Sequence, residues 1–297
     1  ILLMNNFTLY MIASEKATLS LVCSVSGGVL NMVLDFVFIA GLGMGIGGAA
    51  VATGLGYSVT AVVGLVVFSR KKSLLHFKKP VMRFRVLAGA ATNGCSEMAT
   101  ALVTGIITMM FNWTMLRYVG EDGVAAVTII MYVLMFASSL YTGYSYGVAP
   151  MLSYYYGEQN HEKLKKLVAV SLKVIAVISV MTVVMSFALT KPLVSVFARP
   201  DNPVHGLAVT GNRICTIALF FIGFNIFASG MFTALSNGVV SAVLAFSRSF
   251  VFMLVMMLVL PLILGVNGIW LATPAAELMA LLLSAGMFLK YRKRYGY

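Results

Sequence analysis

The charged residues of this chain are gathered into short clusters, and the stretches between the clusters are apolar for about 20 residues or more. Only 10% of the 297 residues are charged, whereas 60% are hydrophobic. A helix needs about 20 apolar residues to cross the hydrocarbon core of a bilayer, because each residue adds about 1.5 Å to its length. The sequence therefore predicts an all-α, polytopic membrane protein.

The apolar runs and the breakers between them predict one partial segment and about eight full transmembrane helices. The partial segment covers residues 1–13. The full segments lie near residues 17–41, 46–69, 86–117, 122–156, 161–190, 205–236, 239–264 and 267–291.

The basic residues, which give the chain a formal net charge of +12, lie mainly in alternate connections between these segments. Clusters fall in 70–85, in 163–166 and in 290–294. Positively charged loops of membrane proteins stay in the cytoplasm. The pattern predicts a multi-pass protein of a bacterial-type plasma membrane with a cytoplasmic C-terminus. Because the charge is placed as topology requires, no nucleic-acid partner is expected.

An internal repeat relates the first part of the chain to the last. A shift of 220 residues superposes apolar runs, glycine turns and basic clusters in one register. The matched residues are Gly45 with Gly265, Gly48 with Gly268, Ala52 with Ala272, and Thr53 with Thr273. Six segments separate each feature from its copy, so the two copies have the same orientation in the membrane.

The repeat predicts two equivalent lobes. Residues 1–70 would be the last helices of an incomplete N-terminal lobe, and 71–85 a basic cytoplasmic loop between lobes. Residues 86–292 would form a complete six-helix C-terminal lobe, and 293–297 a cytoplasmic tail. A first copy of equal length would need roughly 140 further residues upstream. The alternative is a short protein in which the repeat is coincidental.

Glu97 is the most informative ionisable residue for function, because it lies about 16 Å into its predicted helix, near the bilayer midplane. A charge there costs about 2.5–3.5 kcal/mol unless it is paired or faces water. Polar side chains on the same helical face predict a wet cavity, which Glu97 would border as the site that couples a cation or proton to substrate. They are Asn93, Thr100, Thr104, Thr108 and Asn112. The alternative is a packing carboxylate that Arg248 or a hydroxyl satisfies.

Four further ionisable residues fall inside apolar segments. Glu277 is deep in the last segment, and Arg213 lies at a similar depth, which predicts a structural ion pair between them. Arg248 is placed to reach either Glu97 or the headgroup region. Asp35 lies one turn after Asn31, near the outer end of its helix, where a carboxylate is more often an interfacial packing residue than a functional one.

Aromatic and sulfur-containing side chains suit the recognition of flat cations, and the chain has 20 Met and 13 Tyr. Most of them are expected in ordinary membrane packing and interfacial belts. Tyr141 and Tyr144 are the predicted exceptions that line the cavity, because they lie deep in their segment.

No arrangement of residues indicates catalysis, a metal or a cofactor. The three Cys and three His are scattered, without the spacing of a metal site or a disulfide framework. Residues 43–48 fit GxGxxG, but no strand precedes them, so they predict a turn between helices. The chain is expected not to be an enzyme, and no phosphate-binding motif suggests ATP as its energy source.

Several stretches resemble the multidrug and toxic compound extrusion (MATE) family, in family order along nearly the whole chain. They are NMVLDFVFI (31–39), GMGIGGAAVAT (43–53), EMAT (97–100), FN (111–112), YVG (118–120), GYSYGVAP (143–150), SYYYG (153–157) and GIWLATPAAE (268–277). The resemblance implies a MATE-like bundle of two lobes around a central cavity. It also implies a monomeric secondary antiporter in the lipid bilayer, which exports cationic drugs in exchange for sodium ions or protons.

Two other functions stay open at this stage. A lipid-linked oligosaccharide flippase of the related fold group would need several basic residues in its cavity, whereas the predicted stripe is neutral and acidic. A sensor or channel would not require two equivalent halves. If the upstream lobe is incomplete, the 297-residue chain alone is expected to be inactive.

Overall fold

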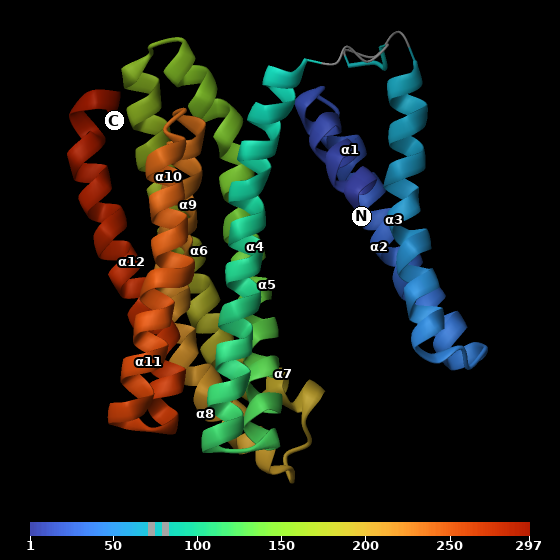
Figure 1. The fold of residues 1–297 in the computed structure, drawn as a ribbon, viewed down its shortest axis with the longest axis vertical. Coiled ribbons are helices and arrows are strands. Elements are labelled where there is room, and N and C mark those ends of the chain that lie inside the picture. Colours follow the sequence, from blue (N-terminus) through green and yellow to red (C-terminus); the bar gives the residue numbers. More distant parts are fainter. Residues whose placement is uncertain (71–74, 79–82) are drawn as a thin grey trace. The chain divides into compact units, whose positions relative to one another are not determined.

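The protein is helical throughout the part that the structure describes. The structure is a computed structural model that describes residues 1–70, 75–78 and 83–297, without the side chains of residue 13 and residues 85–101. The chain forms two units, Ile1–Phe84 and Arg85–Tyr297. The helices and their order are drawn in Figure 1.

Seven helices in the described residues are long and apolar enough to cross a membrane, which confirms the predicted fold class of a multi-pass α-helical membrane protein. They extend over Ala17–Gly41, Gly45–Ser69, Glu121–Gly157, His161–Ala188, Pro203–Ala234, Gly238–Leu264 and Val266–Tyr295. Each corresponds to a segment expected from the sequence. A shorter apolar helix lies at Leu2–Ile12, where the partial segment was predicted.

The first unit is a bundle of three helical segments. They are α1 (Leu2–Ala13), α2 (Ala17–Asp35) with its π-helical continuation η1 (Phe36–Gly41), and α3 (Gly45–Ser69). The α2 and α3 backbones approach closely where glycines meet, since a Cβ on Gly27 would lie 2.6 Å from the carbonyl oxygen of Gly56. Small residues permit such contact between membrane helices, where dispersion rather than hydrophobicity drives association. Phe7 and Met11 of α1 and Phe68 of α3 form the buried core of this unit.

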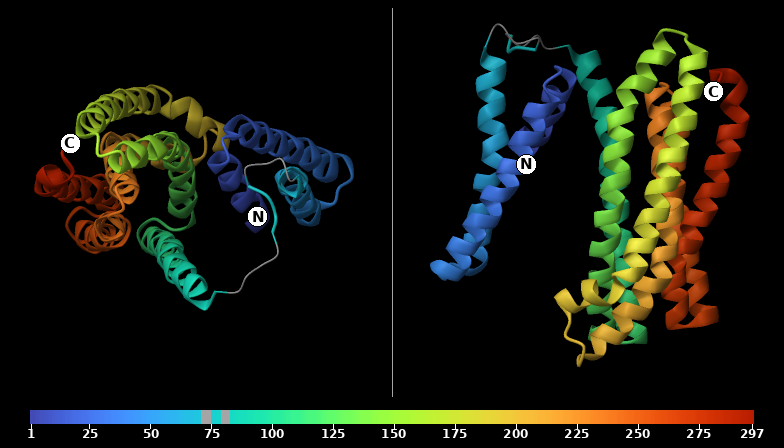
Figure 2. Two further views of the ribbon diagram at one scale, coloured as in Figure 1. Left: turned by 90° about the horizontal axis from the view of Figure 1, so that it is seen from above. Right: turned by 180° about the vertical axis from the view of Figure 1, so that it is seen from behind.

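The second unit contains the remaining helices, which Figure 2 shows from two further directions. They are α4 (Phe84–Tyr118), α5 (Glu121–Gly157), α6 (His161–Ala188), α7 (Thr190–Phe197), α8 (Pro203–Cys215), η2 (Thr216–Ala218), α9 (Leu219–Ala234), α10 (Gly238–Phe246), η3 (Ser247–Phe252), α11 (Met253–Leu264) and α12 (Val266–Tyr295). Of these, α8, η2 and α9 follow one another directly, as do α10, the π-helical η3 and α11.

Asparagine side chains begin three of these helices. The Asn160 side chain accepts a hydrogen bond from the backbone N–H of Lys163, and Asn202 and Asn237 cap α8 and α10 in the same way. Such caps satisfy N–H groups that have no partner within the helix. The short α7 was not predicted, because its residues include Pro192 and lie mostly between two predicted segments, 161–190 and 205–236. It forms because its amphipathic sequence buries Thr190 and Val194.

The three-dimensional structure supports the 220-residue repeat. Gly45 and Gly265 both have φ of +58°, a conformation that glycine adopts without the strain of a side chain. Gly45 begins α3, and Gly265 precedes α12. The order α1, α2–η1, α3 in the first unit therefore corresponds to α9, α10–η3–α11, α12 in the second.

Candidate functional site

The N-terminal half of the predicted polar stripe on α4 lies outside the described side chains. This applies to Asn93, Thr100 and Glu97, so the environment of the predicted coupling carboxylate is not defined. The helix α4 itself extends through these positions, as predicted. The role of Glu97 stays a prediction.

The C-terminal half of the stripe faces away from the core of the second unit. Thr104 and Thr108 are exposed and Asn112 is half-buried. On an adjoining face, about 100° around the helix, the buried hydrophobic side chains repeat every four residues. They are Val103, Ile107, Phe111 and Met115. The helix therefore has one face for packing and one polar face. Whether water borders that polar face stays a prediction.

Asn112 also contributes to an open groove of about 520 Å³ at the turn between α4 and α5. The groove is mostly apolar and holds a single acidic side chain. Its lining residues are Met109, Asn112, Trp113, Leu116, Glu121, Val124 and Ala125. The Arg117 guanidinium lies 5.9 Å from the Trp113 ring centroid, an arrangement typical of an interfacial anchor.

The prediction that Tyr141 lines a cavity is wrong. Tyr141 is 0% exposed, and its hydroxyl donates a hydrogen bond to the Leu219 carbonyl at 2.8 Å. The same hydroxyl lies 2.6 Å from Oγ1 of Thr182. The ring is thus a packing element whose polar end is satisfied inside the unit, as a buried tyrosine requires.

Tyr144 likewise packs against the hydrophobic cluster that contains Phe227, Met231 and Leu164. Tyr144 is only half-buried, so whether it borders a cavity stays a prediction. The sequence could not distinguish these cases, because a tyrosine deep in an apolar segment can either line a cavity or lie in the core with its hydroxyl hydrogen-bonded.

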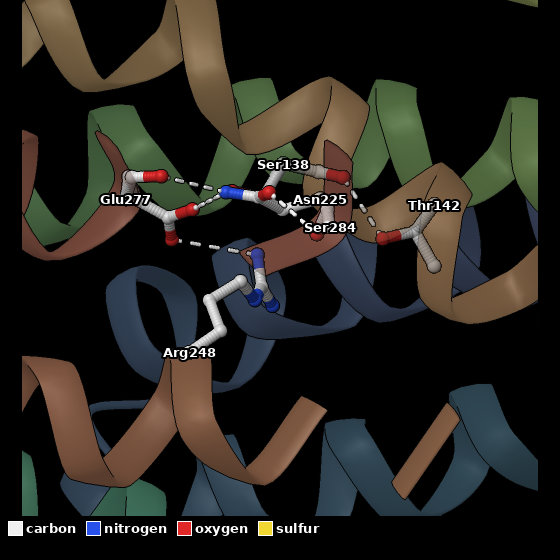
Figure 3. Close-up of polar contacts among 6 residues, drawn as sticks. All are labelled: Ser138, Thr142, Asn225, Arg248, Glu277 and Ser284. Carbon is white, nitrogen blue, oxygen red and sulfur yellow. Dashed lines mark hydrogen bonds and ion pairs between the residues drawn. The ribbon is translucent and has the colours of Figure 1, made fainter. Parts of the chain in front are cut away.

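A buried polar group in the second unit surrounds Glu277 (Figure 3). Glu277, Asn225 and Ser284 are all buried, with exposed fractions of 7%, 3% and 4%. The side-chain amide of Asn225 donates to Oε2 of Glu277 at 2.7 Å and to the Glu277 carbonyl at 2.9 Å. The Ser284 hydroxyl donates to Oδ1 of Asn225 at 3.1 Å. These three residues connect α9 to α12 through polar contacts within apolar helices.

Arg248 completes this group from the π-helical segment η3. Its Nη1 lies 3.4 Å from Oε1 of Glu277, longer than the 2.7–2.9 Å typical of a charge-assisted hydrogen bond. The side chain of Arg248 is 25% exposed, whereas that of Glu277 is 10% exposed. The carboxylate is therefore held firmly by Asn225 and only weakly by the arginine. We refer to Asn225, Arg248, Glu277 and Ser284 as the Glu277 cluster.

The predicted partner of Glu277 was wrong, although the prediction of an ion pair within the second lobe holds. Arg213 is exposed, and its guanidinium lies 5.5 Å from the ring centroid of Phe187 on α6. Depth along a helix was a correct guide, but the direction of the side chain around α8 was not known from the sequence. Asn225 was missed as a site residue, although an amide within the apolar run LFFIGFNIFASG was the available signal.

A second polar group lies between α2 and α3 of the first unit. The Asn31 amide donates to Oγ1 of Thr53 at 3.4 Å. Asp35 is one turn further along α2, and its Oδ1 is buried without a hydrogen-bond partner among the described residues. Asp35 directly precedes the π-helical η1, and π-helical segments occur frequently at functional sites. We refer to Asn31, Asp35 and Thr53 as the Asp35 group.

No group of three or more His, Cys, Asp or Glu side chains that could hold a metal ion was found in the described part of the chain. Asn31, Asp35 and Thr53 offer oxygen atoms but one carboxylate only. Such a set suits a proton or a monovalent cation better than a tightly bound divalent metal, which takes more charged oxygen ligands.

Comparisons with known proteins agree with this arrangement. Multidrug export protein MepA of Staphylococcus haemolyticus is 24% identical over 286 residues, which cover 95% of this chain and 62% of the relative. MepA of Staphylococcus saprophyticus is 23% identical over 254 residues, covering 85% of this chain and 54% of the relative. The chain thus spans little more than half the length of these curated relatives.

Solved structures share the fold. An outward-facing multidrug resistance MATE family transporter matches with a TM-score of 0.86 at 23% sequence identity, covering 98% of this chain and 65% of that one. An inward-facing conformation of such a transporter matches with a TM-score of 0.76. The family model described as MatE matches residues 98–259, which is more than half of the chain. The chain therefore belongs to the MatE family of membrane proteins.

Proposed function

We propose that the chain works as part of a multidrug efflux transporter, a secondary antiporter that exports organic cations in exchange for sodium ions or protons. Family membership and the relatives named multidrug export protein support this proposal. The described helices also supply a multi-pass membrane body. They carry few ionisable side chains, as expected if each intramembrane charge has a task.

The observation that carries the proposal is the carboxylate oxygen of Asp35 that has no hydrogen-bond partner among the residues the structure describes. The Asp35 side chain is half-buried, and its buried oxygen receives no hydrogen bond from the described residues, so a cation that reaches the carboxylate would satisfy that oxygen. Asn31 and Thr53 place an amide and a hydroxyl on adjoining surfaces of α2 and α3. The Asp35 group is therefore proposed as an entry point for the coupling ion, which is cargo rather than a resident cofactor.

Glu97 is proposed as the second coupling carboxylate, on the polar face of α4. If a cationic substrate and the coupling ion occupy these carboxylates in turn, the inward movement of one is linked to the outward movement of the other. One charge that crosses 100 mV supplies about 2.3 kcal/mol. If the substrate and the coupling ion cannot occupy the carboxylates at the same time, the free energy of ion entry drives substrate export.

The proposed organisation keeps the predicted lobes. Residues 1–70 are the last helices of an N-terminal lobe, 71–85 are a cytoplasmic connection, 86–292 form the six-helix C-terminal lobe, and 293–297 are a cytoplasmic tail. The basic clusters at 70–85 and 290–294 then lie on the same side of the membrane. Substrate would bind between lobes that open alternately to the two sides.

The test measures ethidium efflux from bacteria that lack their own exporters and express the protein with its full coding sequence. Asp35→Asn and Glu97→Gln should each lower efflux at least about tenfold, because each removes the charge that binds the coupling ion. Glu15→Gln, at the exposed turn between α1 and α2, is the matched control and should leave efflux unchanged. Normal membrane insertion with undiminished efflux in both coupling variants would refute the coupling mechanism.

A further inference from the structure

Two basic segments of the second unit meet at one end of its helices. The α6 helix begins at His161, and α12 ends at Tyr295. Nδ1 of His161 lies 3.0 Å from the carbonyl oxygen of Tyr295, and the ring centroids of Tyr156 and Tyr295 are 5.5 Å apart. Figure 2 shows the C-terminal end of the chain beside the turn between α5 and α6. The first turns of α6 and the last turns of α12 therefore belong to one surface.

Tyr295 fixes the junction between these two helix ends. Its side chain is buried, and its hydroxyl accepts a hydrogen bond from the side-chain amide of Asn237 at 2.9 Å. Asn237 also caps the first turn of α10, so the junction includes a third helix. The basic side chains beside Tyr295 are thus carried on helices that pack against one another.

Six exposed basic residues on this surface have no carboxylate partner among the described residues. We refer to them as the basic patch. They are Lys163, Lys165, Lys290, Arg292, Lys293 and Arg294. A seventh, Lys166, pairs with Glu162 at 2.7 Å, and Glu158 is the other acidic residue between positions 158 and 166. The surface therefore keeps a clear excess of positive charge, which requires anions from outside the chain.

The surroundings of the basic patch are aromatic and apolar. Nζ of Lys163 lies 5.6 Å from the ring centroid of Tyr155, and the Arg294 guanidinium lies 5.7 Å from that of Tyr295. A cation over an aromatic ring keeps its charge and can still donate hydrogen bonds. Leu289, which is 72% exposed, adds an apolar side chain directly before the cations of α12. Tyrosine and basic side chains at the end of apolar helices are typical of the level of the lipid headgroups.

We propose that the basic patch binds the phosphate groups of anionic phospholipids in the adjoining leaflet of the membrane. Clusters of Lys and Arg directly beside membrane helices attract anionic lipids. Here the phosphates supply the missing anions, and the acyl chains can lie along exposed apolar side chains such as Leu289. This inference concerns how the protein binds its membrane and does not depend on the proposed transport function.

The test measures lipid binding to the purified protein, expressed with its full coding sequence and kept in a neutral detergent. Phosphatidylglycerol and phosphatidylcholine with identical acyl chains are titrated separately, and bound lipid is counted by native mass spectrometry. The wild-type protein should bind phosphatidylglycerol at least about tenfold more tightly. Lys163→Gln/Arg292→Gln/Arg294→Gln should weaken phosphatidylglycerol binding at least about tenfold, because each basic residue near a membrane surface contributes roughly fivefold. Phosphatidylcholine binding should change less than about twofold.

A matched variant controls for the loss of three positive charges. Lys191→Gln/Arg199→Gln/Arg213→Gln removes three exposed basic residues on and between α7 and α8, and it should keep the preference for phosphatidylglycerol. Arg292→Gln alone should weaken phosphatidylglycerol binding roughly fivefold, which keeps the test valid if the triple patch variant does not fold.

Three outcomes would overturn the inference. They are equal affinity of the wild-type protein for the two lipids, an equal loss in the patch variant and the matched variant, and displacement of phosphatidylglycerol by an equal concentration of inorganic phosphate. The last outcome would mean that the surface binds free phosphate rather than lipid. Since bound lipid is counted without any transport, each of these results would leave the proposed function standing.

Discussion

Asn225 is the residue whose replacement tests the Glu277 cluster most directly. Asn225→Ala removes three hydrogen bonds at once: two donated by its amide to Glu277 and one accepted from the Ser284 hydroxyl. The bond to the ionised carboxylate is worth about 1.5–3 kcal/mol and each of the others about 0.5–1.5 kcal/mol. Interhelical bonds measured in membranes lie toward the lower end, near 0.6 kcal/mol with a maximum of about 1.7 kcal/mol. A loss of about 3 kcal/mol in the free energy of unfolding is expected.

The assay is equilibrium unfolding of the purified protein in mixed micelles, with Ser284→Ala and Ser139→Ala as comparisons. Ser284→Ala removes one bond of the cluster and should cost about 1 kcal/mol. Ser139→Ala alters an exposed hydroxyl that bonds only to the Phe136 carbonyl of its own helix, so it should be neutral within about 0.5 kcal/mol. If Asn225→Ala were as mild as the Ser139 variant, the buried carboxylate would not depend on the amide, and the description of the cluster would be incorrect.

Two further predictions concern packing. Tyr141→Phe removes the hydroxyl contacts to the Leu219 carbonyl and to Thr182, so the free energy of unfolding should fall by about 1–2 kcal/mol. The affinity for rhodamine 6G, measured by fluorescence polarisation on the purified protein in lipid nanodiscs, should stay the same, because the ring lies in the core. A weakened affinity at unchanged stability would instead restore the tyrosine to a cavity. Gly27→Ala should reduce the yield of folded protein in gel filtration, since its Cβ would lie 2.6 Å from the Gly56 carbonyl oxygen; the adjacent Gly28→Ala has nothing within 4 Å and should be tolerated, and equal yields would contradict the close α2–α3 contact.

The sequence was sufficient for the helices and their order, because apolar length is a direct requirement of the bilayer. The expected segments 17–41 and 239–264 match the continuous helical stretches at Ala17–Gly41 and Gly238–Leu264. What the apolar pattern could not predict was their internal geometry. Both stretches contain a π-helical turn, at Phe36–Gly41 and Ser247–Phe252. An apolar run has the same composition whether its backbone is α-helical or π-helical.

The partners within the candidate site were harder to predict than its members. Glu277 and Arg248 were both identified as ionisable residues in apolar helices, yet the sequence favoured Arg213 as the partner of Glu277. Helical depth fixes one coordinate of a side chain, whereas the pair distance of 3.4 Å also depends on the rotation of each helix and on the neighbours it packs against. The π-helical turn around Arg248 changes that rotation. No periodicity in the sequence reports it.

The two repeated halves share a scaffold but place their polar groups differently. At the 220-residue shift, Gly28 corresponds to Arg248, and Tyr57 corresponds to Glu277. Gly28 and Tyr57 line the same small cavity of about 100 Å³ in the first unit, just as Arg248 and Glu277 contact each other in the second.

Asp35 of the first unit has no acidic counterpart in the second, since the shift places Val255 at its position. In the first unit, one oxygen of Asp35 has no hydrogen-bond partner within the part of the chain that the structure describes. In the second, a carboxylate already bound by an amide orients an arginine. The two units therefore place acidic side chains at different positions of the repeated scaffold, Asp35 in the first unit and Glu277 in the second.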